Sequence, residues 1–94
     1  MLDKLQELKR QSEESNERLS NLVISEKSTN GMVEIAMNGQ RELKSLTIHG
    51  ELSEIDKEEL EDSLHNTISA VLLRVNKANE DEVMSSAMSI FPGM

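Results

Sequence analysis

The chain has 94 residues, a length that fits one small domain (residues 1–94) with a limited apolar core. It has no cysteine, which excludes disulfides and thiolate metal sites, and no apolar run approaches the ~18 residues of a membrane span. The start lacks a signal-peptide core, so we expect a cytoplasmic location. The formal net charge is −8, and residues 51–94 carry ten acidic and three basic groups, a balance that by itself disfavours nucleic-acid binding.

An amphipathic helix is predicted for residues 2–23. Leucine and serine recur at alternating spacings of three and four, with the two serines at the centre of the pattern. We expect this helix to lie on a sheet, because three heptads with a polar centre are marginal as a coiled coil. Glu14 and Arg18 stand at i, i+4 in the favourable order for an ion pair. The positions of the stripe are Leu5, Leu8, Ser12, Ser15, Leu19 and Leu22.

A first strand is predicted over residues 23–28, where Val23 and Ile24 are β-branched. Thr29-Asn30-Gly31 supplies turn residues directly after it. This strand would form a three-stranded antiparallel meander with the hairpin that follows.

The hairpin is predicted within residues 31–50, with its turn at Asn38-Gly39. Asn-Gly favours a type I′ turn because both residues tolerate a positive φ. A turn that pairs Met37 with Gln40 or with Glu42 places five apolar residues on one face of the sheet. They are Val33, Ile35, Met37, Leu46 and Ile48.

A long C-terminal helix is predicted to begin after Asp56 and to end at about Ala87. Asp56 is a good N-cap, and Glu59 three residues later completes a capping box. The order of elements predicts an α+β fold: helix, three-stranded antiparallel meander, long C-terminal helix. The apolar positions of the last helix are Leu64, Ile68, Val71, Leu72, Val75, Ala78 and Val83.

The predicted lengths of the elements indicate a second copy of the chain. Helices of about 22 and 31 residues span roughly 33 and 46 Å. Strands of about seven residues span only roughly 23 Å, so the apolar stripes of the helices overhang the sheet. A two-fold homodimer would cover them. The residues expected in the core or the dimer contact are Leu5, Leu8, Leu19, Leu22, Val33, Ile35, Leu46, Ile48, Leu64, Ile68, Val71, Leu72 and Val75.

Two stretches carry a resemblance to a known family: Val33-Glu-Ile-Ala-Met-Asn-Gly-Gln-Arg-Glu-Leu-Lys-Ser-Leu-Thr-Ile48 and Ile90-Phe91-Pro92-Gly93-Met94. They resemble the YbaB/EbfC family of small bacterial nucleoid-associated proteins. The resemblance implies a homodimer with paired projecting helices that binds duplex DNA without sequence specificity. It also implies a location on the nucleoid and an effect on chromosome organisation or gene expression. The chain departs from the family where Lys27-Ser-Thr-Asn30 replaces a glycine-rich turn.

The candidate DNA contacts are scattered basic side chains. They support backbone-directed binding, because the only aromatic, Phe91, offers no base-stacking platform and no helix-turn-helix or zinc-finger pattern occurs. Arg74 and Lys77 on the last helix form an alternative location. The candidates are Lys4, Lys9, Arg10 and Arg18 on the first helix, Lys27 and Arg41 in turns, and Lys44 on the third strand.

Neither enzymatic chemistry nor a metal or cofactor is expected. His65 follows Glu61 by four residues, but a third ligand at suitable spacing is missing, so a solvated pair is the favoured interpretation. The acidic run at residues 58–62 is typical of a charged first helical turn. The alternative function is a dimeric protein-interaction scaffold with weak or no DNA binding. The net charge and the replaced glycines favour that alternative.

Overall fold

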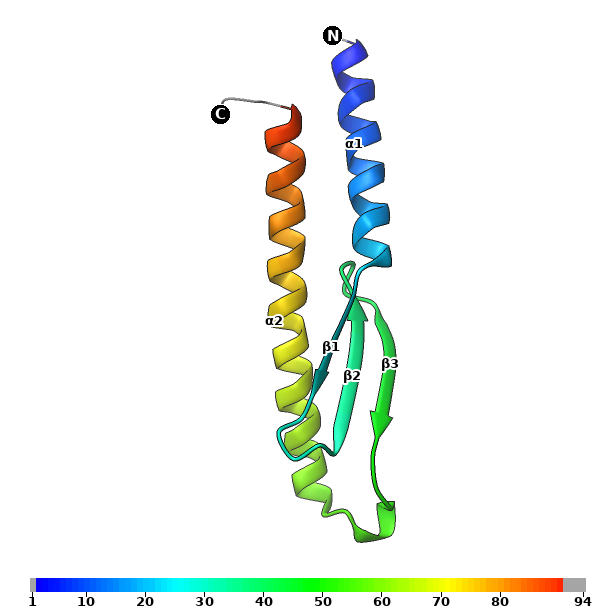
Figure 1. The fold of residues 1–94 in the computed structure, drawn as a ribbon, viewed down its shortest axis with the longest axis vertical. Coiled ribbons are helices and arrows are strands. Elements are labelled where there is room, and N and C mark those ends of the chain that lie inside the picture. The colour runs from blue at the N-terminus through cyan, green and yellow to red at the C-terminus, as the bar shows by residue number, and fades with distance from the viewer. Residues whose placement is uncertain (1, 91–94) are drawn as a thin grey trace.

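The computed structural model describes residues 2–90, which form two long helices and a three-stranded sheet (Figure 1). The part of the chain at 91–94, which contributes to the family resemblance, lies outside this range. The molecule is elongated, with extents of 63 × 21 × 14 Å. The predicted α+β order is confirmed. The elements are α1 (Leu2–Asn21), β1 (Val23–Lys27), β2 (Val33–Asn38), β3 (Leu43–Ile48), a short 3-10 turn (Leu52–Glu54) and α2 (Lys57–Ile90).

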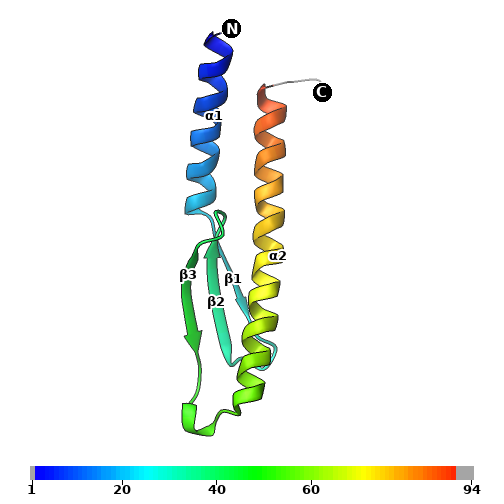
Figure 2. The ribbon, with the colours of Figure 1, turned by 180° about the vertical axis from the view of Figure 1, so that it is seen from behind.

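The sheet is an antiparallel meander in the order β1-β2-β3, and α2 packs against one of its faces (Figure 2). Ile35 of β2 is paired with Glu26 on one side and Leu46 on the other. Val33 is paired with Ile48, so the five apolar residues predicted to share a face do so. The buried core lies between β2 and α2 and consists of Val33, Ile35, Met37, Val71 and Val75.

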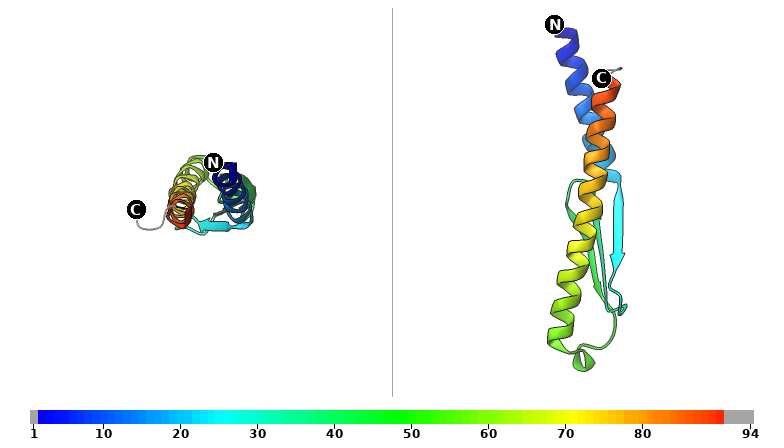
Figure 3. Two further views of the ribbon diagram at one scale, coloured as in Figure 1. Left: turned by 90° about the horizontal axis from the view of Figure 1, so that it is seen from above. Right: turned by 90° about the vertical axis from the view of Figure 1, so that its left-hand side faces the viewer.

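The two helices run side by side beyond the sheet (Figures 1 and 3). We call α1 and residues 76–90 of α2 the two arms. The prediction that α1 lies on the sheet is wrong. Only Leu22 separates the end of α1 from the start of β1, so the chain has no residues with which to reverse direction. The helix therefore continues away from the sheet and packs against α2 instead.

The β2–β3 hairpin is present, but its turn is not the predicted type I′. The residue with a positive φ is Arg41, at 67°, rather than Gly39. The Arg41 amide donates to the Asn38 carbonyl at 3.0 Å, and the Asn38 amide donates to the Glu42 carbonyl at 3.0 Å. This pattern is a type I turn followed by one left-handed residue. A bulge at Ala36/Met37 then places Leu43 opposite Met37.

This turn joins the base of the arms to the sheet. The Gly39 amide lies 2.8 Å from the Leu19 carbonyl, and Asn79 of α2 donates its side-chain amide to the Gly39 carbonyl at 3.1 Å. The fully buried Asn38 donates to the Ser20 carbonyl at 3.1 Å. A Cβ on Gly39 would stand 2.7 Å from the Leu19 carbonyl oxygen. Gly39 is therefore required by close packing and not by its φ.

The predicted N-cap of α2 at Asp56 is present, but the Glu59 side chain of the predicted capping box is bonded to the β1–β2 turn instead. The Glu59 amide donates to the Asp56 carboxylate at 2.9 Å. The Glu59 side chain accepts a hydrogen bond from the Asn30 amide at 3.2 Å, and the same amide donates to Ser63 Oγ at 2.9 Å. These contacts fix the β1–β2 turn on the first turns of the helix. The helix ends at Ile90, three residues beyond the predicted end.

Candidate nucleic-acid interface

The arms and the sheet present apolar surface that the single chain leaves uncovered. β3 lies beyond the reach of α2, and its Leu43 and Leu46 are 56% and 44% exposed. Ile68, on the flank of α2, is 38% exposed. Of the residues expected in the core or the dimer contact, five are buried: Leu19, Val33, Ile35, Val71 and Val75. Ile48, Leu64 and Leu72 are half-buried, and Leu5, Leu8, Leu22, Leu46 and Ile68 are exposed.

The α1 arginines are held by carboxylates. Arg10 donates Nη1 to Glu14 Oε1 at 2.8 Å and Nη2 to Glu7 Oε1 at 2.5 Å. The hydrogen bond from Arg10 lowers the pKa of Glu7. Arg18 donates Nε to Glu82 Oε1 of α2 at 2.7 Å, so the predicted Glu14–Arg18 pair is replaced by a contact between the two arms. Both arginines therefore carry a neutralising partner in the free protein.

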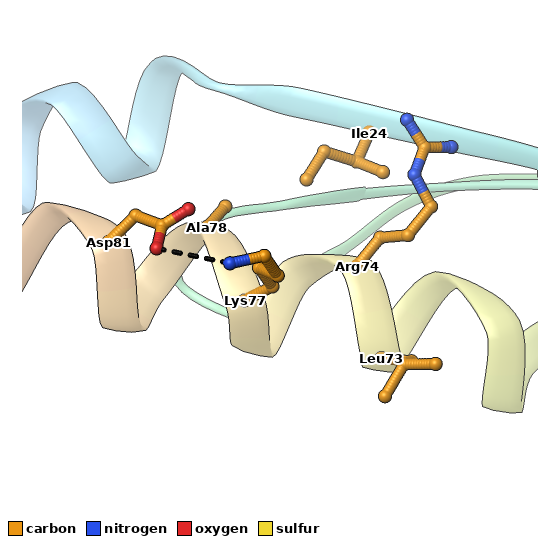
Figure 4. Close-up of a pocket in the computed structure, with 6 residues that line it drawn as sticks. All are labelled: Ile24, Leu73, Arg74, Lys77, Ala78 and Asp81. Atoms are coloured by element: carbon orange, nitrogen blue, oxygen red, sulfur yellow. Dashed lines mark hydrogen bonds and ion pairs between the residues drawn. The ribbon is translucent and has the colours of Figure 1, made fainter.

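The cations around the sheet are held as well. Arg41 donates Nε to Asn76 Oδ1 at 2.7 Å. Arg74 reaches from α2 to β1, where Nη1 lies 2.9 Å from both the Ser25 carbonyl and Glu26 Oε1. Lys77 points along α2 to Asp81, with Nζ 3.4 Å from Oδ1 (Figure 4). The four arginines of the described chain thus all have an intramolecular acceptor.

Arg74 and Lys77 border a pocket of about 430 Å³ between β1 and α2 (Figure 4). Its apolar lining comes from Ile24, Leu73 and Ala78. Both cations that border the pocket are engaged by carboxylates, so it offers no unpaired positive charge to a phosphate. A second pocket, of about 250 Å³, lies between the arms, where Ser12, Ser15 and Ser86 leave α1 and α2 loosely packed.

The structure does not gather the candidate DNA contacts into one basic patch. Four lie along α1: Lys4, Lys9, Arg10 and Arg18. Arg41 and Lys44 lie at the end of the sheet next to the arms, whereas Lys27 ends β1 at the opposite end (Figure 1). Within residues 2–90, Lys9, Lys27 and Lys44 make no ion pair. Among the candidate lysines, these three therefore have a charge that no described carboxylate neutralises by an ion pair.

Charge is distributed unevenly along the long axis. Residues 51–62 carry seven acidic groups and one lysine at the end of the molecule remote from the arms. The arms carry eight acidic and five basic groups, and residues 22–50 carry three of each. A polyanion is therefore repelled least by the sheet and the base of the arms.

The described residues contain no group of three or more His, Cys, Asp or Glu side chains that could hold a metal ion. His65 Nδ1 lies 3.4 Å from Asn66 Oδ1, its neighbour in sequence. Neither α1 nor α2, as described within residues 2–90, has the length and apolar character of a membrane-spanning helix.

The contact between Arg18 and Glu82 is one that sequence reasoning missed. These residues are 64 positions apart, and no local spacing relates them. The Arg10 pairs were open to prediction, because Glu7 and Glu14 stand three and four residues away on the same helix face.

The chain is similar to known proteins over nearly its whole length. Residues 1–90 match the model of the YbaB/EbfC DNA-binding family. A nucleoid-associated protein of Flavobacterium johnsoniae is 36% identical over 97 residues, covering 100% of this chain and 91% of the relative. One from Hahella chejuensis is 30% identical and covers 98% and 87%. The crystal structure of an uncharacterized Helicobacter pylori protein has a TM-score of 0.79 at 26% identity, covering 86% of each chain.

Proposed function

Because the chain belongs to the YbaB/EbfC DNA-binding family, we propose that it is a nucleoid-associated protein that binds duplex DNA without sequence specificity. In this proposal it acts as one domain, residues 1–94, without catalysis, in the cytoplasm on the bacterial nucleoid. The family match over residues 1–90 is the observation that carries the proposal. Its effect on chromosome organisation or gene expression would follow from broad coverage of DNA.

The binding unit in this proposal is a two-fold homodimer. The support is the apolar face that α2 leaves uncovered, formed by Leu43, Leu46 and Ile48 of β3 and by Leu64, Ile68 and Leu72 of α2. A second copy brings the same strip of β3 and α2, and a two-fold axis makes such a patch self-complementary. Burial of these leucines and isoleucines is favourable at about 25 cal/mol per Å² of apolar surface. The arms stay outside this contact.

The DNA-contacting surface in the proposal is α1 together with Arg41 and Lys44 at the adjoining end of the sheet. Lysine and arginine side chains there would contact phosphates, which position a protein on DNA without reading its sequence. The acidic balance of the arms limits the number of contacts. We expect about three to six phosphates per dimer, with a log–log salt slope near −0.9 for each.

Fluorescence anisotropy with several unrelated duplexes, at low and at physiological salt, tests this function. We expect similar affinity for every sequence and a steep loss of binding as the salt concentration rises. A tenfold or larger preference for one sequence would contradict non-specific binding. Failure to bind any duplex at low salt would contradict DNA binding altogether.

A protein-interaction scaffold is the second candidate, and it is favoured by the carboxylate partners of Arg10, Arg18 and Arg74 and by the net charge of −8. Charges that are already neutralised contribute little to the attraction of a polyanion. A scaffold would remain dimeric in light scattering and would bind no duplex at low salt. The anisotropy experiment therefore distinguishes the two functions.

A further inference from the structure

An ion pair between residues distant in sequence joins the arms. Arg18 of α1 places Nε at 2.7 Å and Nη2 at 2.5 Å from Glu82 Oε1 of α2. The Glu82 side chain is 20% exposed and Arg18 is 53% exposed. The hydrogen bond from Arg18 lowers the pKa of Glu82, with a smaller contribution from Ser15. The carboxylate is therefore charged and held in place at neutral pH.

A phosphate would use the same atoms of Arg18. The guanidinium presents Nε–H and Nη2–H as a planar fork, and this fork fits a carboxylate or a phosphate equally well in shape. The Nε–H of this fork already donates to Glu82 Oε1, and Nη2 lies 2.5 Å from the same oxygen. Arg18 cannot offer this fork to DNA while it remains bound to Glu82.

We propose that Glu82 is an intramolecular competitor of the DNA backbone, so that Arg18 contacts a phosphate only after it leaves Glu82. This inference rests on the proposed DNA-binding function. Departure of Arg18 leaves the Glu82 carboxylate with Ser15 as its remaining side-chain hydrogen-bond partner, which opposes the exchange. The pair therefore restrains the affinity of the arms for DNA beyond its effect on net charge.

The neighbouring acid on α2 provides a matched control. Glu80 is exposed, lies two residues before Glu82, and makes no ion pair with another residue in the 2–90 range. Replacing either glutamate by glutamine changes the net charge of the chain by one unit at nearly the same height on the arm. Only the change at position 82 removes the partner of Arg18.

The experiment compares the wild type with Glu80→Gln and Glu82→Gln by anisotropy across a series of salt concentrations. We expect Glu80→Gln to raise affinity slightly without a change in salt slope. Glu82→Gln should raise affinity further and steepen the slope by about 0.9 for each released arginine, because one more phosphate is neutralised. In an Arg18→Gln background, the two glutamine variants should bind DNA equally.

Equal affinities and slopes for Glu80→Gln and Glu82→Gln, with wild-type DNA binding intact, would overturn this inference and leave the proposed function standing. If the wild type binds no duplex, gain of binding by Glu82→Gln alone supports the competition, and its absence overturns both proposals.

Circular dichroism verifies that the arms stay helical in each variant. If Glu82→Gln loses helix, an NMR titration of the wild type tests the exchange instead, by following the side-chain Nε–Hε signal of Arg18. That signal must move on addition of duplex if Arg18 exchanges partners, and an unmoved signal would contradict the exchange.

Discussion

Gly39 illustrates how one residue type can be required for a reason that the sequence does not reveal. Asn38-Gly39 correctly predicts a hairpin, since the pair is a strong turn signal in any sequence. The φ that favours glycine is found instead at Gly31, at 75°, at Gly50, at 107°, and at the non-glycine Arg41, at 67°. Gly39 is needed because α1 packs against the turn, and that contact depends on the tertiary position of a helix nearly twenty residues earlier.

Substitution of the two turn glycines by asparagine separates these explanations. Asparagine tolerates a left-handed φ, so Gly31→Asn should leave the stability nearly unchanged. A Cβ at position 31 would lie 3.9 Å from Lys27 Cε, which is an ordinary van der Waals contact. Gly39→Asn should destabilise by roughly 1–3 kcal/mol, because its Cβ meets the Leu19 backbone. Denaturant unfolding of both variants at one protein concentration measures the difference. Equal stability of the two would instead support the type I′ turn expected from sequence.

At the scale of elements, prediction succeeded where local chemistry decides and failed where packing decides. The cap at Asp56 and the shared face of β2 and β3 follow from short-range patterns, and both are present. The position of α1 depends on the single-residue link at Leu22 and on the availability of the α2 arm. A stripe with serines at its centre is the same in sequence whether the helix packs on a sheet or on another helix. Its period therefore could not indicate the partner.

Two exposed leucines differ in position: Leu46 belongs to the uncovered strip of β3 and α2, and Leu73 lies outside it. Leu46 is 44% exposed on β3, and Leu73 is 73% exposed on α2, where it lines the pocket on the β1 side. In an isolated chain, a charge at either position would be solvated. In the proposed dimer, Leu46→Glu would bury an unpaired charge in the contact, while Leu73→Glu would stay in water.

Light scattering of the two glutamate variants tests the dimer contact. We expect the wild type and Leu73→Glu to have twice the chain mass of 10.6 kDa at micromolar concentration. Leu46→Glu should shift toward the monomer mass and remain folded by circular dichroism. A wild type that measures 10.6 kDa throughout a dilution series would contradict the dimer. A Leu73→Glu variant that dissociates as readily as Leu46→Glu would place the contact elsewhere.

For the whole molecule, the distribution of charge sets which end can approach DNA. The sequence already indicates that the acidic excess lies in residues 51–94, but only the fold shows that residues 51–62 lie far from the arms. The fold also places Lys44 next to the arms and Lys27 at the other end of the sheet, although they are 17 positions apart in one meander. These lysines make no ion pair within residues 2–90, so their removal leaves no orphaned acid.

Three lysine-to-glutamine variants therefore map the proposed DNA surface with equal changes in net charge. Lys9→Gln on α1 and Lys44→Gln on β3 should each weaken binding to all duplexes alike and reduce the salt slope by about 0.9 for each phosphate that is no longer neutralised. Lys27→Gln should leave the slope unchanged, because this lysine adjoins the acidic end. Anisotropy titrations at several salt concentrations supply both affinity and slope, and light scattering confirms an unaltered assembly. A reduced slope for Lys27→Gln, with the slopes of Lys9→Gln and Lys44→Gln unchanged, would move the DNA from the arms to the far end of the sheet.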